Sequence, residues 1–178
     1  MISEPSLHRM KILVIDDDRL SVTLLEQLLQ RHGYSRVMGI TNSRAALETC
    51  ATFDPDLILL DLIMPEVDGL TVLEALRSDV SERFLPILVL TADTTEEAKG
   101  RALEAGATDF LVKPVSQTEA LLRIRNLLEA RRLNVILRNQ RAALEEAVRE
   151  RTTELRETTG DLEAANQRLQ SSSAFSDV

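Results

Sequence analysis

Five short apolar runs, separated by amphipathic stretches, restrict the fold of this chain more than any other feature of its sequence. The runs lack strict alternation of apolar and polar residues, which is typical of strands buried on both faces of a parallel sheet. They are residues 11–15, 37–40, 57–60, 87–90 and 109–112. Leucines or alanines at helical spacing lie between them, and two of these stretches stop at Gly33 and Gly106. The order of elements predicts an α/β fold with a doubly wound, five-stranded parallel sheet and right-handed crossovers.

Composition is that of a globular protein in a reducing compartment. Hydrophobic residues make up 44% of the 178 residues and charged residues 28%. No apolar run approaches the roughly 20 residues needed to cross a bilayer, and residues 1–10 lack the apolar core of a signal peptide. Cys50 is the one cysteine, so an internal disulfide is excluded and a buried thiol is expected. These features predict a cytoplasmic protein without a membrane segment.

Charge disfavours a nucleic-acid-binding protein. The formal net charge is −8, of which −7 falls in residues 1–131 and −1 in residues 132–178. An acidic chain repels nucleic acid unless it segregates a basic face. Lysine is scarce: 3 lysines stand against 18 arginines, which makes each lysine a candidate for a specific role.

One long helix, or two helices in series, is predicted for residues 116–170, with Ser116 as the N-cap and Ser43 capping an earlier helix. Its first third, with Leu121, Leu122, Ile124, Leu127 and Leu128, should pack on the sheet. Beyond that a heptad seam appears, with a positions Val148, Leu155, Leu162 and Leu169 and d positions Leu137, Leu144, Arg151, Thr158 and Ala165. Apolar a and mixed d positions predict a parallel homodimeric coiled coil through residues 131–170, weakened at Gly160.

Polar side chains follow four of the five predicted strands, at the edge where open α/β sheets bind ligands. In chain order they are Asp16, Asp17 and Asp18, then Asp61, then Thr91 and Asp93, then Lys113. Carboxylates gathered there need a counter-charge, and Mg²⁺ (or Mn²⁺) suits carboxylate and water oxygens. Lys113 can reach a phosphoryl oxygen and Thr91 supplies a hydroxyl. Asp61, on the central strand, is the best candidate to form an aspartyl phosphate.

Four sequence stretches, in order and at family spacing, resemble the receiver domain of two-component response regulators. They are residues 12–18 (ILVIDDD), 59–65 (LLDLIMP) with Asp68-Gly69, 89–92 (VLTA) and 106–114 (GATDFLVKP). The resemblance covers about residues 10–130 and implies a flavodoxin-like sheet of strand order 2-1-3-4-5. The expected domains are a tail at 1–9, a receiver at 10–130, a coiled-coil signalling helix at 131–170 and a frayed tail or truncated linker at 171–178.

The resemblance also implies roles for the site residues. Asp61 is the phosphoacceptor, charged by a histidine kinase or phosphotransfer protein. Asp16 and Asp17 bind the metal together with the Asp61 carboxylate and the backbone carbonyl of Ile63. The chain itself would then be a phosphoacceptor and not an enzyme.

The resemblance also implies roles in switching and in the lifetime of the phosphoryl group. Thr91 is the switch hydroxyl and Phe110 the switch aromatic, while a cis Lys113–Pro114 bond aims the lysine at the site. Ile63 and Asp93 tune the lifetime of the phosphoryl group. Ile63 is apolar and offers no group to position water, so we expect a long-lived phosphate.

Two alternatives remain from the residues themselves. Asp16-x-Asp18 resembles the nucleophile motif of haloacid-dehalogenase-type phosphatases, in which Asp16 would carry the phosphate in place of Asp61. Leu20 stands where that motif has Thr or Val. Alternatively, four arginines before the leucine heptad (Arg131, Arg132, Arg138 and Arg141) resemble a sparse basic zipper.

The output of the regulator stays open. Residues 144–155 resemble linkers that join receivers to diguanylate cyclases, cyclic-di-nucleotide phosphodiesterases or hybrid histidine kinases. None of those catalytic motifs occurs within the chain. The sequence therefore fits either a regulator acting through its coil or the regulatory fragment of a larger enzyme.

Overall fold

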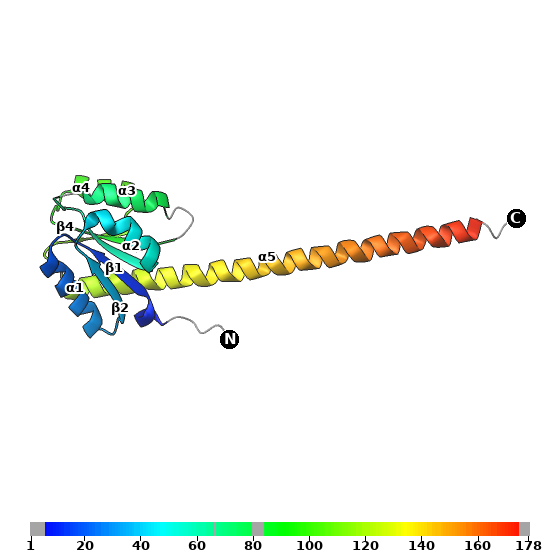
Figure 1. The fold of residues 1–178 in the computed structure, drawn as a ribbon, viewed down its shortest axis with the longest axis horizontal. Helices are drawn as coiled ribbons and strands as arrows, with labels where there is room; N and C mark the ends of the chain where they lie inside the picture. The colour runs from blue at the N-terminus through cyan, green and yellow to red at the C-terminus, as the bar shows by residue number, and fades with distance from the viewer. Residues whose placement is uncertain (1–5, 66, 80–83, 175–178) are drawn as a thin grey trace. The chain divides into compact units, whose positions relative to one another are not determined.

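A five-stranded, all-parallel sheet forms the core of the protein (Figure 1). The computed structural model describes residues 6–65, 67–79 and 84–174. The sheet has the order β2-β1-β3-β4-β5, which confirms the doubly wound, flavodoxin-like prediction. Its strands are β1 (Lys11–Ile15), β2 (Arg36–Ile40), β3 (Leu57–Asp61), β4 (Ile87–Thr91) and β5 (Asp109–Val112). Each contains one of the predicted apolar runs, because a parallel strand is covered on both faces.

Helices cover both faces of this sheet (Figure 1). They are η1 (Leu7–Arg9), α1 (Arg19–Arg31), η2 (Ser43–Ala45), α2 (Ala46–Phe53), α3 (Gly69–Asp79), α4 (Glu96–Glu104) and α5 (Gln117–Ala174). Alternate strand residues face opposite layers. Leu13 and Ile15 join the layer under α2, α3 and α4, whereas Ile12 and Val14 join the layer under α1 and the first turns of α5.

The first turns of α5 bury a narrow stripe of side chains. Ala120, Ile124 and Leu128 are buried at i, i+4 and i+8, as expected for a helix that lies along a sheet. Of the five residues predicted to pack there, Leu122 is the exception and is 48% exposed. Leu122 is two residues from both Ala120 and Ile124, about 200° around the helix, so it faces away from the sheet.

The predicted caps have mixed outcomes. Asn42, and not Ser43, supplies the capping side chain before η2, by accepting the Arg44 amide at 3.0 Å. Ser43 lies inside the turn and is buried. Ser116 directly precedes α5, and its Oγ accepts the Glu119 amide at a long 3.5 Å. Cys50 is buried, as predicted, and is a free thiol.

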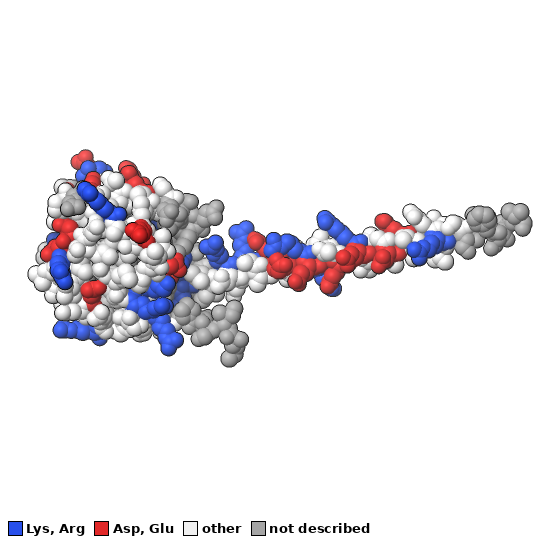
Figure 2. Space-filling model, viewed as in Figure 1, with Lys and Arg blue, Asp and Glu red and all other residues white. Residues whose placement is uncertain are grey.

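Contacts divide the chain into two units, Met1–Asn134 and Val135–Val178. The described part of the second unit is helical throughout, including Gly160, and α5 continues as far as Ala174. Residues 171–174, predicted as part of a frayed tail or truncated linker, belong to this helix, and residues 175–178 lie outside the described part of the chain. Acidic and basic side chains alternate along this unit (Figure 2), with ion pairs such as Arg141–Glu145 and Arg151–Glu154. Within the described ranges, no helix has the length and apolar character of a membrane span.

Candidate functional site

The predicted site residues meet at the carboxyl edge of the sheet. Ile15 pairs with Leu60, so Asp16 and Asp61 follow side by side at the ends of β1 and β3. The Lys113 ammonium lies 2.9 Å from Asp16 Oδ2 and 3.1 Å from Asp61 Oδ2. Both carboxylates are buried. The lysine is aimed at them from the loop after β5, and its peptide bond to Pro114 is cis, as the resemblance implied.

The charges of this cluster do not balance. Carboxylate oxygens of Asp16, Asp17 and Asp61 all lie within 4.8 Å of one another. Three carboxylates face one ammonium, so a fully ionised cluster keeps an excess of two negative charges. Asp17 is exposed, which leaves one side of the cluster open to solvent. The donor set therefore fits a hard divalent cation that retains several waters.

Burial and neighbouring charges shift the pKa values of two groups in the cluster. Burial raises the pKa of the Asp61 carboxyl above its ordinary value, and the charge of Asp16 adds to this rise, against the opposing effect of Lys113. Burial alone would lower the pKa of Lys113, but hydrogen bonds to Asp16 and Asp61 outweigh it and leave that pKa raised. Lys113 is thus held as a cation at neutral pH.

Thr91 lies on the strand next to that of Asp61, and Phe110 lies on the strand after that. Asp61 pairs with Leu90, which places Thr91 one residue further along the neighbouring strand. Its buried Oγ1 accepts the Asp93 amide at 3.1 Å. Phe110 on β5 is half-buried, with the Lys99 ammonium 5.3 Å from its ring centroid. Thr91 therefore pairs with Asp93 and not with Asp61 in this structure.

The remaining predicted residues fall into two groups. Ile63 is 60% exposed, and its amide donates to Asp61 Oδ1 at 3.3 Å. Asp18, for which the sequence indicated no role, is the N-cap of α1 and accepts the amides of Leu20 and Ser21. In the phosphatase alternative Asp18 would be the general acid, but its carboxylate is engaged in this cap.

Gly69 belongs to the sequence stretches that carry the resemblance, but the sequence indicated no role for it beyond an ordinary Asp-Gly turn. A Cβ at Gly69 would lie 2.4 Å from the Asp61 carbonyl oxygen and 2.5 Å from Leu62 Cα. Its amide also donates to the Leu62 carbonyl at 3.0 Å. A glycine is therefore required for α3 to begin against the end of β3.

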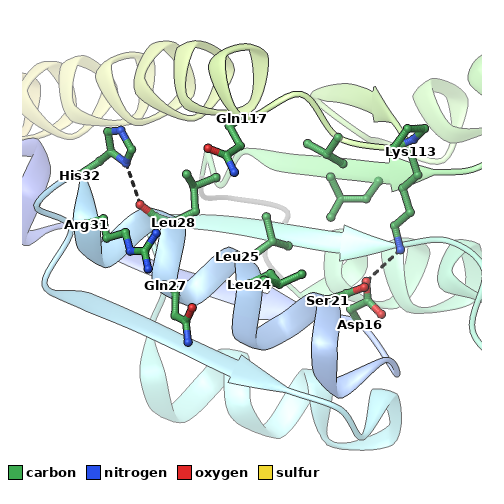
Figure 3. A pocket seen from close by; sticks show the side chains of 13 residues that line it. Asp16, Ser21, Leu24, Leu25, Gln27, Leu28, Arg31, His32, Lys113 and Gln117 are labelled. Atoms are coloured by element: carbon green, nitrogen blue, oxygen red, sulfur yellow. Dashed lines mark hydrogen bonds and ion pairs between the residues drawn. The ribbon is translucent and has the colours of Figure 1, made fainter.

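A groove of about 470 Å³ begins at Asp16 and Lys113 and runs along α1 (Figure 3). Its walls are apolar, from Leu24, Leu25 and Leu28 of α1 with Leu90, Pro114 and Val115 across from them. Arg31 and His32 lie at the far end, where His32 Nδ1 contacts the Leu28 carbonyl at 2.8 Å. No sequence motif marked this groove, because it forms between segments about 90 residues apart.

Comparison with known proteins agrees with this geometry. The response regulator receiver domain model matches residues 12–125. The chain is 42% identical over 118 residues to the alkaline phosphatase synthesis transcriptional regulatory protein PhoP of Bacillus subtilis, covering 66% of this chain and 48% of PhoP. It superposes on chemotaxis protein CheY4 of Vibrio cholerae with a TM-score of 0.63 and 31% identity, covering 67% of this chain and 98% of CheY4.

A third relative extends the similarity beyond the receiver region. The chain is 32% identical over 154 residues to a probable cyclic di-GMP phosphodiesterase of Vibrio cholerae, covering 86% of this chain and 34% of that protein. The chain thus spans about half of PhoP and a third of the phosphodiesterase. The family match, the strand order and the solved CheY4 fold converge on one conclusion: the chain belongs to the response regulator receiver domain family.

Proposed function

We propose that this chain is a phosphorylation-dependent response regulator whose phosphoacceptor is Asp61. The observation that supports this most is the Lys113 ammonium bonded to both Asp16 and Asp61 at the sheet edge. In that arrangement the buried Asp61 carboxylate lies beside the Lys113 ammonium, and Thr91 follows on the neighbouring strand. The exposed Asp17 leaves the cluster accessible to solvent.

In the proposed reaction an Asp61 oxygen attacks the phosphorus of a phosphohistidine on a histidine kinase or phosphotransfer protein. The new bond is O–P and the bond that breaks is P–N, whose electron pair stays with the imidazole as it leaves. Lys113 stabilises the negative charge of the transferring phosphoryl oxygens. Thr91 then turns its hydroxyl from Asp93 toward the phosphate, and Phe110 follows it inward.

Asp16, Asp17 and Asp61, with the backbone carbonyl of Ile63, would hold a Mg²⁺ or Mn²⁺ ion. The excess of two negative charges in the cluster supports a divalent cation at this position. When bound, such an ion neutralises the charge of the transferring phosphoryl group.

The groove along α1 is the surface on which the phosphodonor would dock. A donor histidine must reach Asp61, so the element that carries it lies across the mouth of the groove at Asp16 and Lys113. Leu20 and Leu24 of α1 are 64% and 57% exposed and lie beside that path. Two exposed leucines next to an apolar groove suit an apolar helix of a partner.

Within residues 131–170, the heptad positions from Leu137 onward would form a parallel homodimeric coiled coil. Leu144, Leu155, Leu162 and Leu169 are each at least 60% exposed in the single chain. Leucines at these heptad positions gain nothing from exposure on a single solvated helix, whereas a second copy of the helix would bury them. Two of the four arginines of the basic-zipper alternative form ion pairs within the helix, Arg132 with Glu129 and Arg141 with Glu145. These pairs disfavour that alternative.

A second candidate is that the chain regulates an attached enzyme. Its similarity to the phosphodiesterase covers 86% of the chain, which leaves about 25 residues outside. Wherever the matched span lies, it therefore includes residues 30–150 and part of the coil. The intact mass of the gene product from its own cells separates the two: 19.9 kDa means a regulator acting through its coil, and a larger mass means an attached output domain.

Phosphorylation itself is tested with acetyl phosphate and MgCl₂. We expect one phosphoryl group by intact-mass spectrometry, none in Asp61→Asn, and an unchanged result in Asp18→Asn, where asparagine preserves the cap. Phosphate on Asp16 would contradict the proposal and support the phosphatase alternative.

A further inference from the structure

Arg131 is a buried charge far from the phosphorylation site. Among the residues that the structure describes, the buried polar side chains are Asp16, Ser43, Asp61, Thr91 and Arg131. Three of these form the site and Ser43 lies in η2. Arg131 is 8% exposed, and burying an arginine is costly unless its donors are satisfied. Its burial therefore needs a reason that the site does not supply.

The partners of Arg131 lie at the amino ends of the central strands. Nη1 donates to the Phe84 carbonyl at 2.8 Å, just before β4, and Nε donates to Asp56 Oδ1 at 3.4 Å, just before β3. The other oxygen of Asp56 accepts the Lys11 amide of β1 at 3.0 Å. One guanidinium thus connects α5 to the starts of the three strands whose opposite ends carry Asp16, Asp61 and Thr91.

A second arginine holds the same segment from the other layer. Arg77 of α3 donates to the Leu85 carbonyl at 2.6 Å and to the Gly106 carbonyl at 2.6 Å. Phe84 and Leu85 are therefore bonded from both faces of the sheet, by α5 and by α3. The start of β4 is therefore held by hydrogen bonds from two helices, and α5 is bound to it through Arg131.

The position of Arg131 along α5 coincides with the end of the sheet-containing unit. The buried stripe of Ala120, Ile124 and Leu128 continues to Arg131, and the unit ends at Asn134, one turn later. Arg131 is thus the last deeply anchored residue of α5 before the heptad seam.

We propose that Arg131 is the positioning residue that couples the phosphorylation switch to the coiled coil. It fixes the rotation of α5 relative to β3 and β4 at the point where the helix leaves the sheet. A displacement of the strand ends at Asp61 and Thr91 then reaches the coil as a rotation of α5, because α5 cannot turn independently of β3 and β4 at Arg131. This inference rests on the proposed function, because it needs both the phosphoacceptor and the coil.

The test uses the full chain with Cys50→Ala and Leu155→Cys, so that disulfide formation across the seam reports its geometry. The measured quantity is the ratio of crosslinking rates with and without acetyl phosphate, together with the phosphorylated fraction by intact mass. Arg131→Met removes the donors at similar volume. Arg125→Met is the matched control, because Arg125 is exposed on the same helix.

We expect a ratio clearly different from one in the parent and in Arg125→Met, and a ratio of one in Arg131→Met with normal phosphorylation. A merely structural role would change both crosslinking rates and leave their ratio. If Arg131→Met does not melt cooperatively, Asp56→Asn decides the matter, since it keeps an acceptor for the Lys11 amide but removes the charge.

Three outcomes would overturn the inference. A ratio in Arg131→Met equal to that of the parent removes its role while leaving the proposed function intact. Loss of phosphorylation in Arg131→Met would mean that it acts on the site. A ratio of one in the parent, with Asp61 phosphorylated, would refute transmission through the coil and this inference with it.

Discussion

The Lys113 ammonium lies 3.1 Å from the Asp61 carboxylate even though β4 separates β3 from β5 in the sheet. The lysine therefore reaches across the end of β4, the strand that carries Thr91. Its own amide donates to the Thr91 carbonyl at 2.7 Å, which fixes the loop. Asp61, the Lys113 ammonium and Thr91 are thus confined to the ends of three adjacent strands.

Asp61→Asn should stabilise the protein at neutral pH without divalent ions. Because burial raises the pKa of Asp61, its ionised form costs stability in the folded state. That cost is absent at low pH and appears as pH rises from the unfolded pKa through the folded one. We expect a rise in Tm of a few degrees, the size of about 1 kcal/mol, measured by thermal denaturation at pH 7. A difference between variant and parent that does not grow from pH 3 to pH 7 would contradict this account.

Asp17→Asn should weaken Mg²⁺ binding. Loss of a group in the outer shell of a metal costs about 10–100-fold in affinity, and a direct ligand should matter at least as much. Titration calorimetry with MgCl₂ measures the effect. Asp18→Asn is the control, since Asp18 caps α1 and lies outside the cluster. Equal affinities in the two variants would remove Asp17 from the site.

Ile63→Asn should shorten the life of the phosphoryl group. Ile63 is exposed beside Asp61, and an amide there can position an attacking water where the apolar side chain cannot. Positioning a reactant is worth about tenfold to a hundredfold in rate. Hydrolysis of the phosphorylated protein is followed by intact mass, with Ile63→Val as the apolar control. Similar rates in all three proteins would refute a role for this position.

Leu24→Arg should impair phosphotransfer from the cognate kinase or phosphotransfer protein but not from acetyl phosphate. Leu24 is exposed at the groove along α1, so the proposed macromolecular donor would touch it and a small donor would not. We expect the kinase-dependent rate to fall about fivefold or more, as for a central interface residue. Exposed Leu103 of α4, away from the groove, supplies the control Leu103→Arg. Equal losses with both donors would mean that the substitution damages the site itself.

Arg151→Leu should strengthen the proposed coiled-coil dimer. Arg151 occupies a d position and pairs with Glu154 of its own helix, so the seam is interrupted there. Burying one leucine from each chain adds about 1.5–3 kcal/mol apiece, or more than about tenfold in dimer affinity. Sedimentation equilibrium measures the dissociation constant. Arg149→Leu, off the seam, is the matched control and should leave it unchanged.

The sequence predicted the strands and the convergence of Asp61 with Lys113 because both follow from local pattern and sheet topology. Apolar runs mark the strands, and parallel strands bring their carboxyl ends to one edge. The burial of Arg131 had no such signal. In the sequence it stands beside Arg132 as part of a basic stretch, and only the packing of α5 on strands 75 residues away distinguishes them. The structural reason for a glycine at position 69 was also not predictable, because only the fold brings the Asp61 carbonyl close enough to exclude a Cβ there.

Asp56 joins the two ends of the receiver region. Its carboxylate contacts both the Lys11 amide, where the chain enters the sheet, and Arg131, where α5 leaves it. Both connections to flanking segments therefore lie at the edge of the sheet opposite Asp16 and Asp61. A domain joined to either end of this unit would be attached away from the edge that carries the proposed phosphorylation site.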